Sequence, residues 1–214
     1  MKLWLATGAL ALLVPFAGMA QRAPEFHPTA QGFLFLPIAL DNPVFDNLTD
    51  VLGQVDGAFQ LPLYKGFGAG VGVNATWYEL NENALAPEYT LGDVNRLVFY
   101  GKLTYSHYTG ARTFYELNAK LGQSTWKWNC RTCAGNDTQS GFHWGLNAAL
   151  FLHATDNLAF GLSVGYQQDA TSFGPGVVGL ESFPGRTDTG GPYRFLNVGL
   201  GFSTTFQKGD EGVW

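Results

Sequence analysis

The chain of 214 residues carries few charges: Asp, Glu, Lys and Arg together make up only 14% of it. Soluble domains average about 25%, so the chain lacks the charge that would cover a surface facing water on all sides. The charges it has are mostly acidic, with a formal net charge of −5 and no basic cluster. Because nucleic-acid binding depends on basic patches, a nucleic-acid partner is excluded. A hydrophobic content of 46% excludes an extended disordered chain.

Long apolar runs are absent beyond residue 20, so no membrane-spanning helix, which needs about 20 apolar residues, is expected there. At the start, Met1-Lys2 precedes an apolar run from Leu3 to Phe16 and the small-residue end Ala17-Gly18-Met19-Ala20. This pattern predicts a secretory signal peptide over 1–20, cleaved after Ala20. An uncleaved anchor is the alternative, although the run is short. Residue 21 is Gln and not Cys, which argues against a lipid-anchored lipoprotein.

Apolar residues alternate with small or polar ones along most of the remaining chain. In 196–206, Leu, Val, Leu, Phe, Thr and Phe at every second position alternate with Asn, Gly, Gly, Ser and Thr. Because successive side chains of a strand point to opposite faces, such segments are predicted β-strands. Eight segments qualify: 32–40, 51–63, 67–77, 96–108, 114–126, 142–152, 158–167 and 196–206. The first is apolar on both faces and contains Pro37, which a strand tolerates at a bulge or an edge.

The connections between these segments alternate in length. Short links fall at 64–66, 109–113 and 154–157, and long ones, rich in Asn, Asp, Gly and Pro, fall at 41–50, 81–95, 129–141 and 170–192. Tight turns at one end and long loops at the other are typical of an outer-membrane barrel. The predicted fold is therefore all-β, an antiparallel up-and-down eight-stranded transmembrane β-barrel over 32–206. Residues 21–31 are expected to form an N-terminal periplasmic segment and 207–214 a C-terminal tail.

Alternation alone does not say which face lies inside, because a soluble lipocalin-like barrel alternates too, with its apolar face inward. Here the polar face is rich in glycine, which in a narrow lumen makes room for larger side chains. The glycines are Gly68, Gly70, Gly72, Gly161, Gly165, Gly199 and Gly201. The apolar face also carries essentially no charge in mid-strand, where Lys or Arg facing lipid would cost about 2–4 kcal/mol. Both features favour the membrane barrel.

Aromatic residues gather near the strand ends and predict two interfacial girdles. By the long loops these are Trp77, Trp126, Trp128 and Trp144, and by the short turns Tyr64, Phe67, Tyr105, Tyr108, Tyr115 and Phe160.

The chain resembles small outer-membrane β-barrel proteins of the OmpA- or OmpX-like type, and more generally the outer-membrane β-barrel domain proteins of Bacteroidota. The resemblance covers about Gly32 to Phe206 and is architectural. The segment 196–206 is similar to the C-terminal signal read by the barrel-assembly machinery, although eight residues, Gln207 to Trp214, follow Phe206. The resemblance implies an outer-membrane location and contact with outer-membrane lipid.

The predicted lumen holds a polar network. Its members are Asp56, Arg96, Lys102, Glu116, Lys120 and His143, with His153 and Asp169 also pointing inward. Buried charges need partners, so this network is expected to close the barrel, with a narrow small-solute channel as the alternative. A hydrolase built on His143, Ser163 and Asp169 is the enzymatic alternative, but Asp169 and Ser163 lie at different depths. No catalytic residues are expected.

Cys130 and Cys133 lie in the third long loop. In an exported chain with two cysteines a disulfide is the default interpretation. A zinc site needs four ligands and only two are clustered, so neither a metal nor another cofactor is expected.

The fourth long loop contains apolar residues, among them Phe173, Leu180 and Phe183. They predict either a docking surface for a partner or a loop that packs on itself over the barrel mouth. The expected function is therefore structural or interactive, through the long loops. An accessory subunit of a larger secretion or uptake complex is one version, by family analogy alone.

Overall fold

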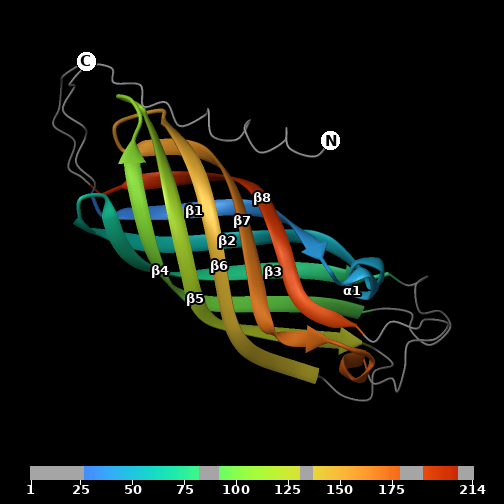
Figure 1. Ribbon diagram of the computed structural model, residues 1–214. Coiled ribbons are helices and arrows are strands. Elements are labelled where there is room, and N and C mark those ends of the chain that lie inside the picture. The colour runs from blue at the N-terminus through green and yellow to red at the C-terminus, as the bar shows by residue number, and fades with distance from the viewer. Residues whose placement is uncertain (1–26, 82–91, 131–136, 179–189, 207–214) are drawn as a thin grey trace, which may run out of the picture.

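The computed structural model describes residues 27–81, 92–130, 137–178 and 190–206, and most of them lie in strands (Figure 1). In chain order the elements are β1 (Thr29–Leu40), α1 (Pro43–Leu48), β2 (Thr49–Tyr64), β3 (Phe67–Leu80), β4 (Gly92–Tyr108), β5 (Thr113–Cys130), β6 (Asp137–His153), β7 (Leu158–Phe173), the 3-10 turn η1 (Pro175–Val178) and β8 (Gly191–Thr205). None of the described helices is long and apolar enough to cross a membrane.

The strands form one closed barrel in which each pairs antiparallel with its neighbours in sequence, and β1 pairs with β8. The closing ladder runs from Thr29 opposite Thr205 to Leu40 opposite Arg194. The prediction of an all-β, up-and-down, eight-stranded barrel is confirmed. The start of β1, the end of β8 and the tight turns all lie at one end, the short-turn end. The helix α1 lies at the opposite end, the loop end (Figure 1).

The strands are longer than the alternating segments indicate, at 12 to 18 residues. Crossing a bilayer as a tilted strand takes only about 9–11 residues, so the sheet extends beyond that length. β1 begins at Thr29 and not at Gly32, which puts residues 29–31 in the barrel wall. The ladder to β8 reaches that far because Thr29 to Gln31 pair with Ser203 to Thr205.

The turn between β2 and β3 consists of Lys65 and Gly66, both with positive φ, at 46° and 87°. Positive φ at both central residues is the pattern of a two-residue hairpin turn whose twist matches the strands. The connection expected to be a long loop over 41–50 differs. It spans 41–48, because β2 begins at Thr49, and it contains the helix α1 over 43–48.

Pro37 lies where β1 has parted from β2. The ladder between these strands ends with Phe35 opposite Gln54, whereas the ladder between β1 and β8 continues to Leu40. The absent N–H of Pro37 therefore costs no hydrogen bond to β2, which fits the edge position expected for a proline in a strand.

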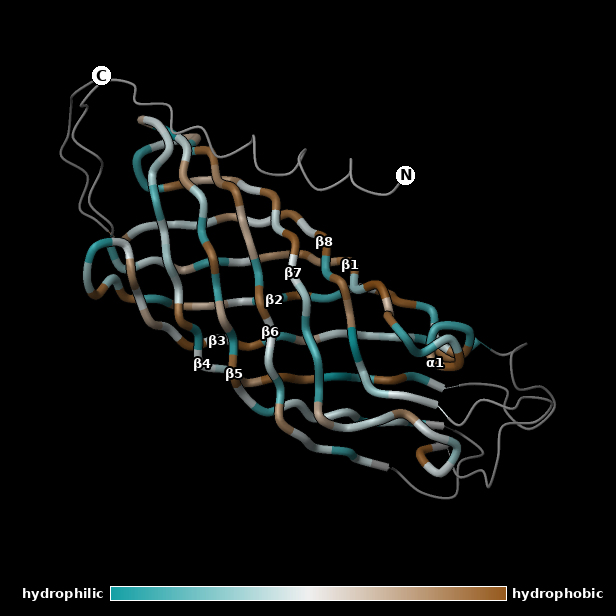
Figure 2. Tube along the Cα trace, in the orientation of Figure 1, coloured by the Kyte–Doolittle hydropathy of each residue, from teal (hydrophilic) through white to brown (hydrophobic). Residues whose placement is uncertain are grey.

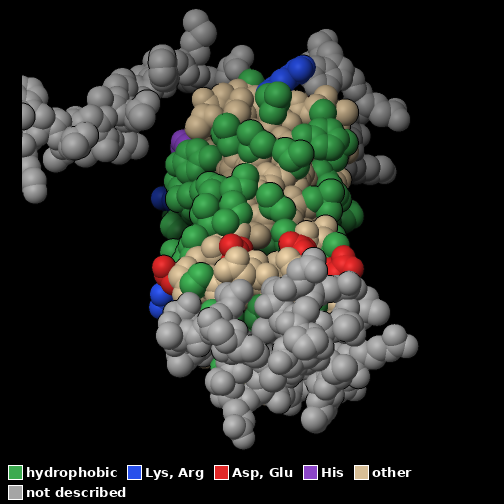
Figure 3. Space-filling model, turned by 90° about the vertical axis from the view of Figure 1, so that its right-hand side faces the viewer, with side chains coloured by type: hydrophobic (Ala, Val, Ile, Leu, Met, Phe, Trp, Pro, Cys, Tyr) green, Lys and Arg blue, Asp and Glu red, His purple; other side chains and the backbone are tan. Residues whose placement is uncertain are grey.

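The apolar face of the sheet points outward. Leu34 and Leu200 are 67% and 64% exposed, while inward side chains such as Asp56 and Arg96 are buried. Hydrophobic and hydrophilic residues alternate along each strand in Figure 2. In Figure 3 the apolar side chains form a belt, with acidic side chains at its border on the loop side. This arrangement is opposite to that of a soluble lipocalin-like barrel.

Glycines on the inner wall stand where large side chains need room. A Cβ at Gly201 would collide with the ring of Phe33, and one at Gly72 with the hydroxyl of Tyr100. A Cβ at Gly161 would lie 2.7 Å from the ring of Phe151. The glycine-rich inner face is therefore a packing requirement of a small filled barrel.

Candidate functional site

The lumen is the candidate site, because the strands direct nearly all the buried polar side chains into it. Inward positions alternate along each strand, so residues far apart in sequence meet across the barrel. The six residues of the predicted network, Asp56, Arg96, Lys102, Glu116, Lys120 and His143, all lie inside, as does Asp169. They form three groups, each built around one carboxylate.

The first group, nearest the loop end, is centred on Asp169 of β7. Arg96 of β4 binds it with two bonds, Nε to Oδ2 at 2.8 Å and a terminal nitrogen to Oδ1 at 2.9 Å. His143 Nδ1 lies 2.8 Å from Oδ1, and Trp126 Nε1 donates to Oδ2 at 2.7 Å. Arg96 also donates to Asn74 Oδ1 at 3.0 Å. The fork of the guanidinium matches the carboxylate, which is the strong form of this pair.

The second group is centred on Asp56 of β2. Lys120 Nζ lies 2.8 Å from Oδ2, and the Tyr100 hydroxyl donates to Oδ1 at 2.6 Å. Asn74 Nδ2 also donates to Asp56, at 3.2 Å. Since Asn74 accepts from Arg96 as well, it links this group to the first.

The third group is centred on Glu116 of β5, nearer the short-turn end. Lys102 Nζ lies 3.0 Å from Oε1, and Oε2 accepts from Gln31, Gln60 and Ser106 at 3.1, 2.8 and 3.2 Å. Sequence alternation across the hairpin predicts this approach of Lys102 to Glu116.

Each buried carboxylate is therefore paired with one cation, so the three ion pairs are neutral. Isolated buried charges would be costly, and pairs with further hydrogen bonds are tolerated. Such an arrangement cross-links strands on opposite sides of the barrel and leaves no unpaired charge among these residues to attract an ion.

An apolar cluster fills the loop end of the lumen, and Phe45 of α1 lies at its centre. Trp126, Trp128 and Phe173 belong to this cluster and are almost completely buried. The prediction that Trp126 and Trp128 form part of an interfacial girdle is wrong. Both have the same parity as Glu116 along β5, so they point inward. Phe173 packs in the mouth, so its assignment to an exposed docking surface is also wrong.

Two other girdle positions by the long loops face outward as expected, since Trp77 is 43% exposed and Trp144 is half-buried on the outer face. At the short-turn end, Phe67 packs on Tyr105 with ring centroids 5.0 Å apart on the outside of the barrel. Tyr108 is different, because its hydroxyl lies 3.1 Å from His153 Nε2 and its side chain packs against an inner apolar cluster around Phe151.

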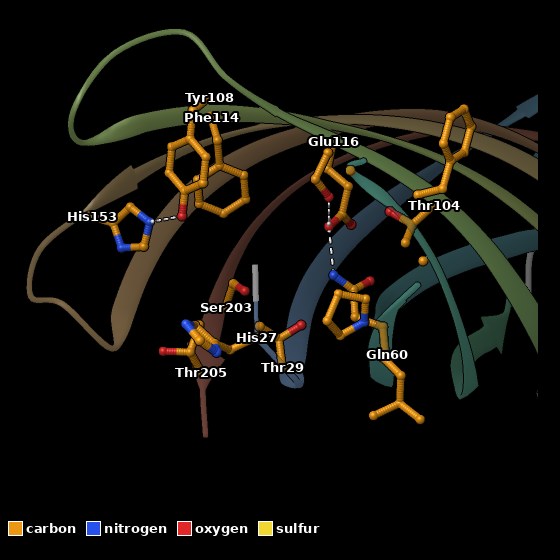
Figure 4. A pocket seen from close by; sticks show the side chains of 16 residues that line it. His27, Thr29, Gln60, Thr104, Tyr108, Phe114, Glu116, His153, Ser203 and Thr205 are labelled. Carbon is orange, nitrogen blue, oxygen red and sulfur yellow. Dashed lines mark hydrogen bonds between the residues drawn. The ribbon is translucent and has the colours of Figure 1, made fainter. Parts of the chain in front are cut away.

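A small pocket opens in the lumen at the short-turn end, with a volume of about 30 Å³. Figure 4 shows Tyr108 and His153 on one side of it and Gln60 and Glu116 on the other. A space of this size holds about one water molecule.

A hydrolytic triad is not assembled by the described residues. Ser163 Oγ donates to the Ala148 carbonyl at 3.2 Å and accepts from Asn147, whereas His143 is hydrogen-bonded to Asp169 and Arg96. A nucleophile needs its base within hydrogen-bond reach, and the partners of Ser163 are an amide and a carbonyl.

Three other predicted site residues are not described. Cys133, Leu180 and Phe183 lie outside the described ranges, and the side chain of Cys130 is not described either. The disulfide and the remaining docking residues stay predictions.

No protein-family model and no curated protein matches the chain. Solved structures do match it. Neisserial surface protein A (NspA) shares 11% identity and a TM-score of 0.53, with 84% of this chain and 97% of NspA covered. OprG from Pseudomonas aeruginosa shares 10% identity and a TM-score of 0.49, with 86% of this chain and 98% of OprG covered. The attachment invasion locus protein Ail from Yersinia pestis shares 9% identity and a TM-score of 0.45, with 84% of this chain and 99% of Ail covered.

At these identities the likeness concerns the fold alone, and the suggested kinship with Bacteroidota proteins stays a prediction. The closed antiparallel eight-stranded wall, its apolar exterior and its filled polar lumen give this chain the fold of the small outer-membrane β-barrels.

Proposed function

We propose that this chain is an exported, non-enzymatic outer-membrane protein whose barrel crosses the membrane with a closed lumen and acts through its loop end. The observation that carries the proposal is the filled interior. Three neutral ion pairs occupy the middle, and the aromatic residues around Phe45 occupy the loop end.

The outer surface supports the membrane location. Large apolar side chains stand exposed on every strand, where water would disfavour them and lipid would not. Exposed aromatic rings at the short-turn end, such as Phe67 and Phe160, fit a membrane interface. The proposed signal peptide 1–20 and the terminal strand β8 would supply export and recognition by the barrel-assembly machinery.

Electrophoretic mobility tests the membrane barrel directly. A folded membrane barrel resists SDS, so the purified protein should migrate differently with and without boiling and should need detergent to stay soluble. Identical migration, together with solubility in plain buffer, would show that the barrel is not a membrane protein.

The loop end is the proposed interaction surface, and Leu180 and Phe183 are its candidate docking residues. One version makes the chain an accessory subunit of a larger secretion or uptake complex. A tagged copy is isolated from native outer membranes in mild detergent and its partners are identified by mass spectrometry. The control carries Leu180→Ser and Phe183→Ser. A stoichiometric partner that the control loses supports loop docking. A barrel that is isolated alone contradicts the accessory-subunit version.

The proposed disulfide between Cys130 and Cys133 would pin the tip of the third long loop. Thiol labelling followed by mass measurement tests it. Labelling of both cysteines only after reduction is expected, and labelling without reduction would contradict the disulfide.

A further inference from the structure

Phe45 lies inside a cage of aromatic rings. The six rings of the cage are Tyr78 of β3, Trp126 and Trp128 of β5, Phe173 of β7, and Tyr193 and Phe195 of β8. Their centroids lie 5.3 to 6.1 Å from that of Phe45, with interplanar angles of 74° to 88°. These are edge-to-face contacts, the arrangement that the charge distribution of aromatic rings favours.

The cage and its occupant come from different parts of the fold. All six rings of the cage are carried by strands of the closed wall, whose ladders do not involve α1. They also support one another, since Trp126 stacks on Tyr193 with centroids 4.0 Å apart and Trp128 on Phe173 with centroids 5.0 Å apart. The six rings are therefore held by the wall and by one another as well as by Phe45.

Phe45, by contrast, is carried by the six-residue helix α1, which is too short to be stable alone. Asn42 holds the helix, accepting from the Phe45 N–H at 3.2 Å and donating to the Gly191 carbonyl at 3.0 Å. At the other end, the Asn81 N–H donates to the Leu48 carbonyl at 2.9 Å. Asp41, just before the helix, has a φ of 56°, in the left-handed region that Asp adopts more readily than most residues. The buried side chains of α1 are Val44, Phe45 and Leu48, all in the apolar cluster, and Phe45 is the one that the six rings surround.

The cage also has polar groups at its edge. The Tyr78 hydroxyl is buried and has no hydrogen-bond partner among the described residues. The guanidinium of Arg96 lies 5.4 Å from the centre of the Trp126 ring. An aromatic hydrocarbon alone would leave the Tyr78 hydroxyl unsatisfied, whereas a ligand that carries an oxygen could accept from it.

We propose that the aromatic cage is a binding site for a small aromatic molecule bearing an oxygen, and that Phe45 is a built-in occupant that this ligand displaces. The mutually stacked rings on the wall, the separate short helix that carries Phe45 and the unpartnered Tyr78 hydroxyl together support this assignment. It goes beyond a closed structural barrel, because it gives the loop end a ligand.

Binding of benzyl alcohol to the full mature protein, folded in detergent, tests the proposal. Binding is followed by tryptophan fluorescence and confirmed by calorimetry. If the cage is open in about 0.1–10% of molecules, removing Phe45 tightens apparent binding by roughly 10- to 1,000-fold. Phe45→Ala should therefore bind at least about tenfold more tightly than the wild type. Phe99→Ala, which removes a phenylalanine ring from the outer face, should bind benzyl alcohol no more tightly than the wild type.

The variant Asn42→Ala distinguishes a ligand site that Phe45 occupies from a cavity that exists only because the Phe45 ring was removed. It loosens α1 and leaves the Phe45 ring in place, so it should bind more tightly than the wild type and less tightly than Phe45→Ala. Adding Tyr78→Phe to Phe45→Ala should weaken binding. If Phe45→Ala does not fold, as judged by its mobility without boiling, Asn42→Ala carries the test. The proposal is overturned if neither variant binds saturably, if Phe99→Ala gains as much, or if Asn42→Ala matches the wild type while Phe45→Ala binds.

Discussion

Replacing Asp169 by leucine should destabilise the barrel strongly, because the change leaves the buried charge of Arg96 without its partner. The side chains of Asp169 and Arg96 are both completely buried, and Asp169 accepts both bonds of the Arg96 fork as well as that of Trp126. Removing one partner of a buried ion pair typically costs about 3–5 kcal/mol. Against a total stability of about 5–15 kcal/mol, that is a large share.

The double variant Arg96→Met/Asp169→Leu separates the charge from the packing. Replacing both partners of a buried pair by apolar residues of similar size is often neutral or stabilising. The double variant should therefore lose only the bonds that Trp126, His143 and Asn74 make to the pair, at about 1–3 kcal/mol for each group left unsatisfied. The sum of the two single losses should therefore exceed the loss in the double variant by several kcal/mol, which measures the coupling.

Urea titration of the protein folded in lipid vesicles gives these free energies, with the folded fraction read from unboiled gels. Arg194→Met is the matched control, because it breaks the exposed pair with Asp41, at 3.2 Å, which should contribute about 0–1 kcal/mol. If Asp169→Leu and Arg96→Met each fell within about 1 kcal/mol of the wild type, the pair would not be buried as described.

Two further predictions concern the wall of the barrel. Gly201→Val should lower the free energy of unfolding by about 1–3 kcal/mol in the same titration, because the new side chain collides with Phe33. Gly57→Ala is the control, since the space around Gly57 is open, and it should change that free energy by less than about 0.5 kcal/mol. Equal losses of stability in the two variants would contradict the conclusion that Gly201 makes room for the Phe33 ring. Leu200→Arg should lower the stability in lipid vesicles by about 2–4 kcal/mol, since its side chain is 64% exposed on the outer face; an unchanged stability would show that Leu200 does not face lipid.

The sequence predicts the wall of the barrel well, for a physical reason. In β8, Leu200 and Gly201 must face opposite sides, and a glycine-rich face makes sense only where large rings need space. The same logic places Lys102 beside Glu116 across a tight hairpin. Local alternation and turn length determine these features, so no tertiary information is needed.

The filling of the loop end is harder to predict. Trp126 and Trp128 continue the inward parity of β5, and that parity is the signal that could have placed them inside. The position of these two tryptophans near the end of β5 favours an interfacial girdle instead. Phe45 gives no such signal, because α1 is six residues long and lies in a connection. Its place is decided by the rings of four strands that meet only in the closed barrel.

Gln31, Asn74 and Tyr100 are likewise missed by a search for charges. They are neutral, yet they bridge or cap the buried carboxylates and so complete the ion-pair groups. Buried carboxylates keep free lone pairs after one ion pair forms, and that need for further donors is the signal that could have found them.

Electrical recording in a planar lipid bilayer tests the central claim, that the lumen is closed, most directly. The folded protein is inserted and the current is recorded over a range of voltages, with a known porin as the positive control. Paired charges and an aromatic loop end predict insertion without stable current steps. Reproducible steps that disappear when Lys102 or Lys120 is replaced would place an open path through the lumen and contradict the account.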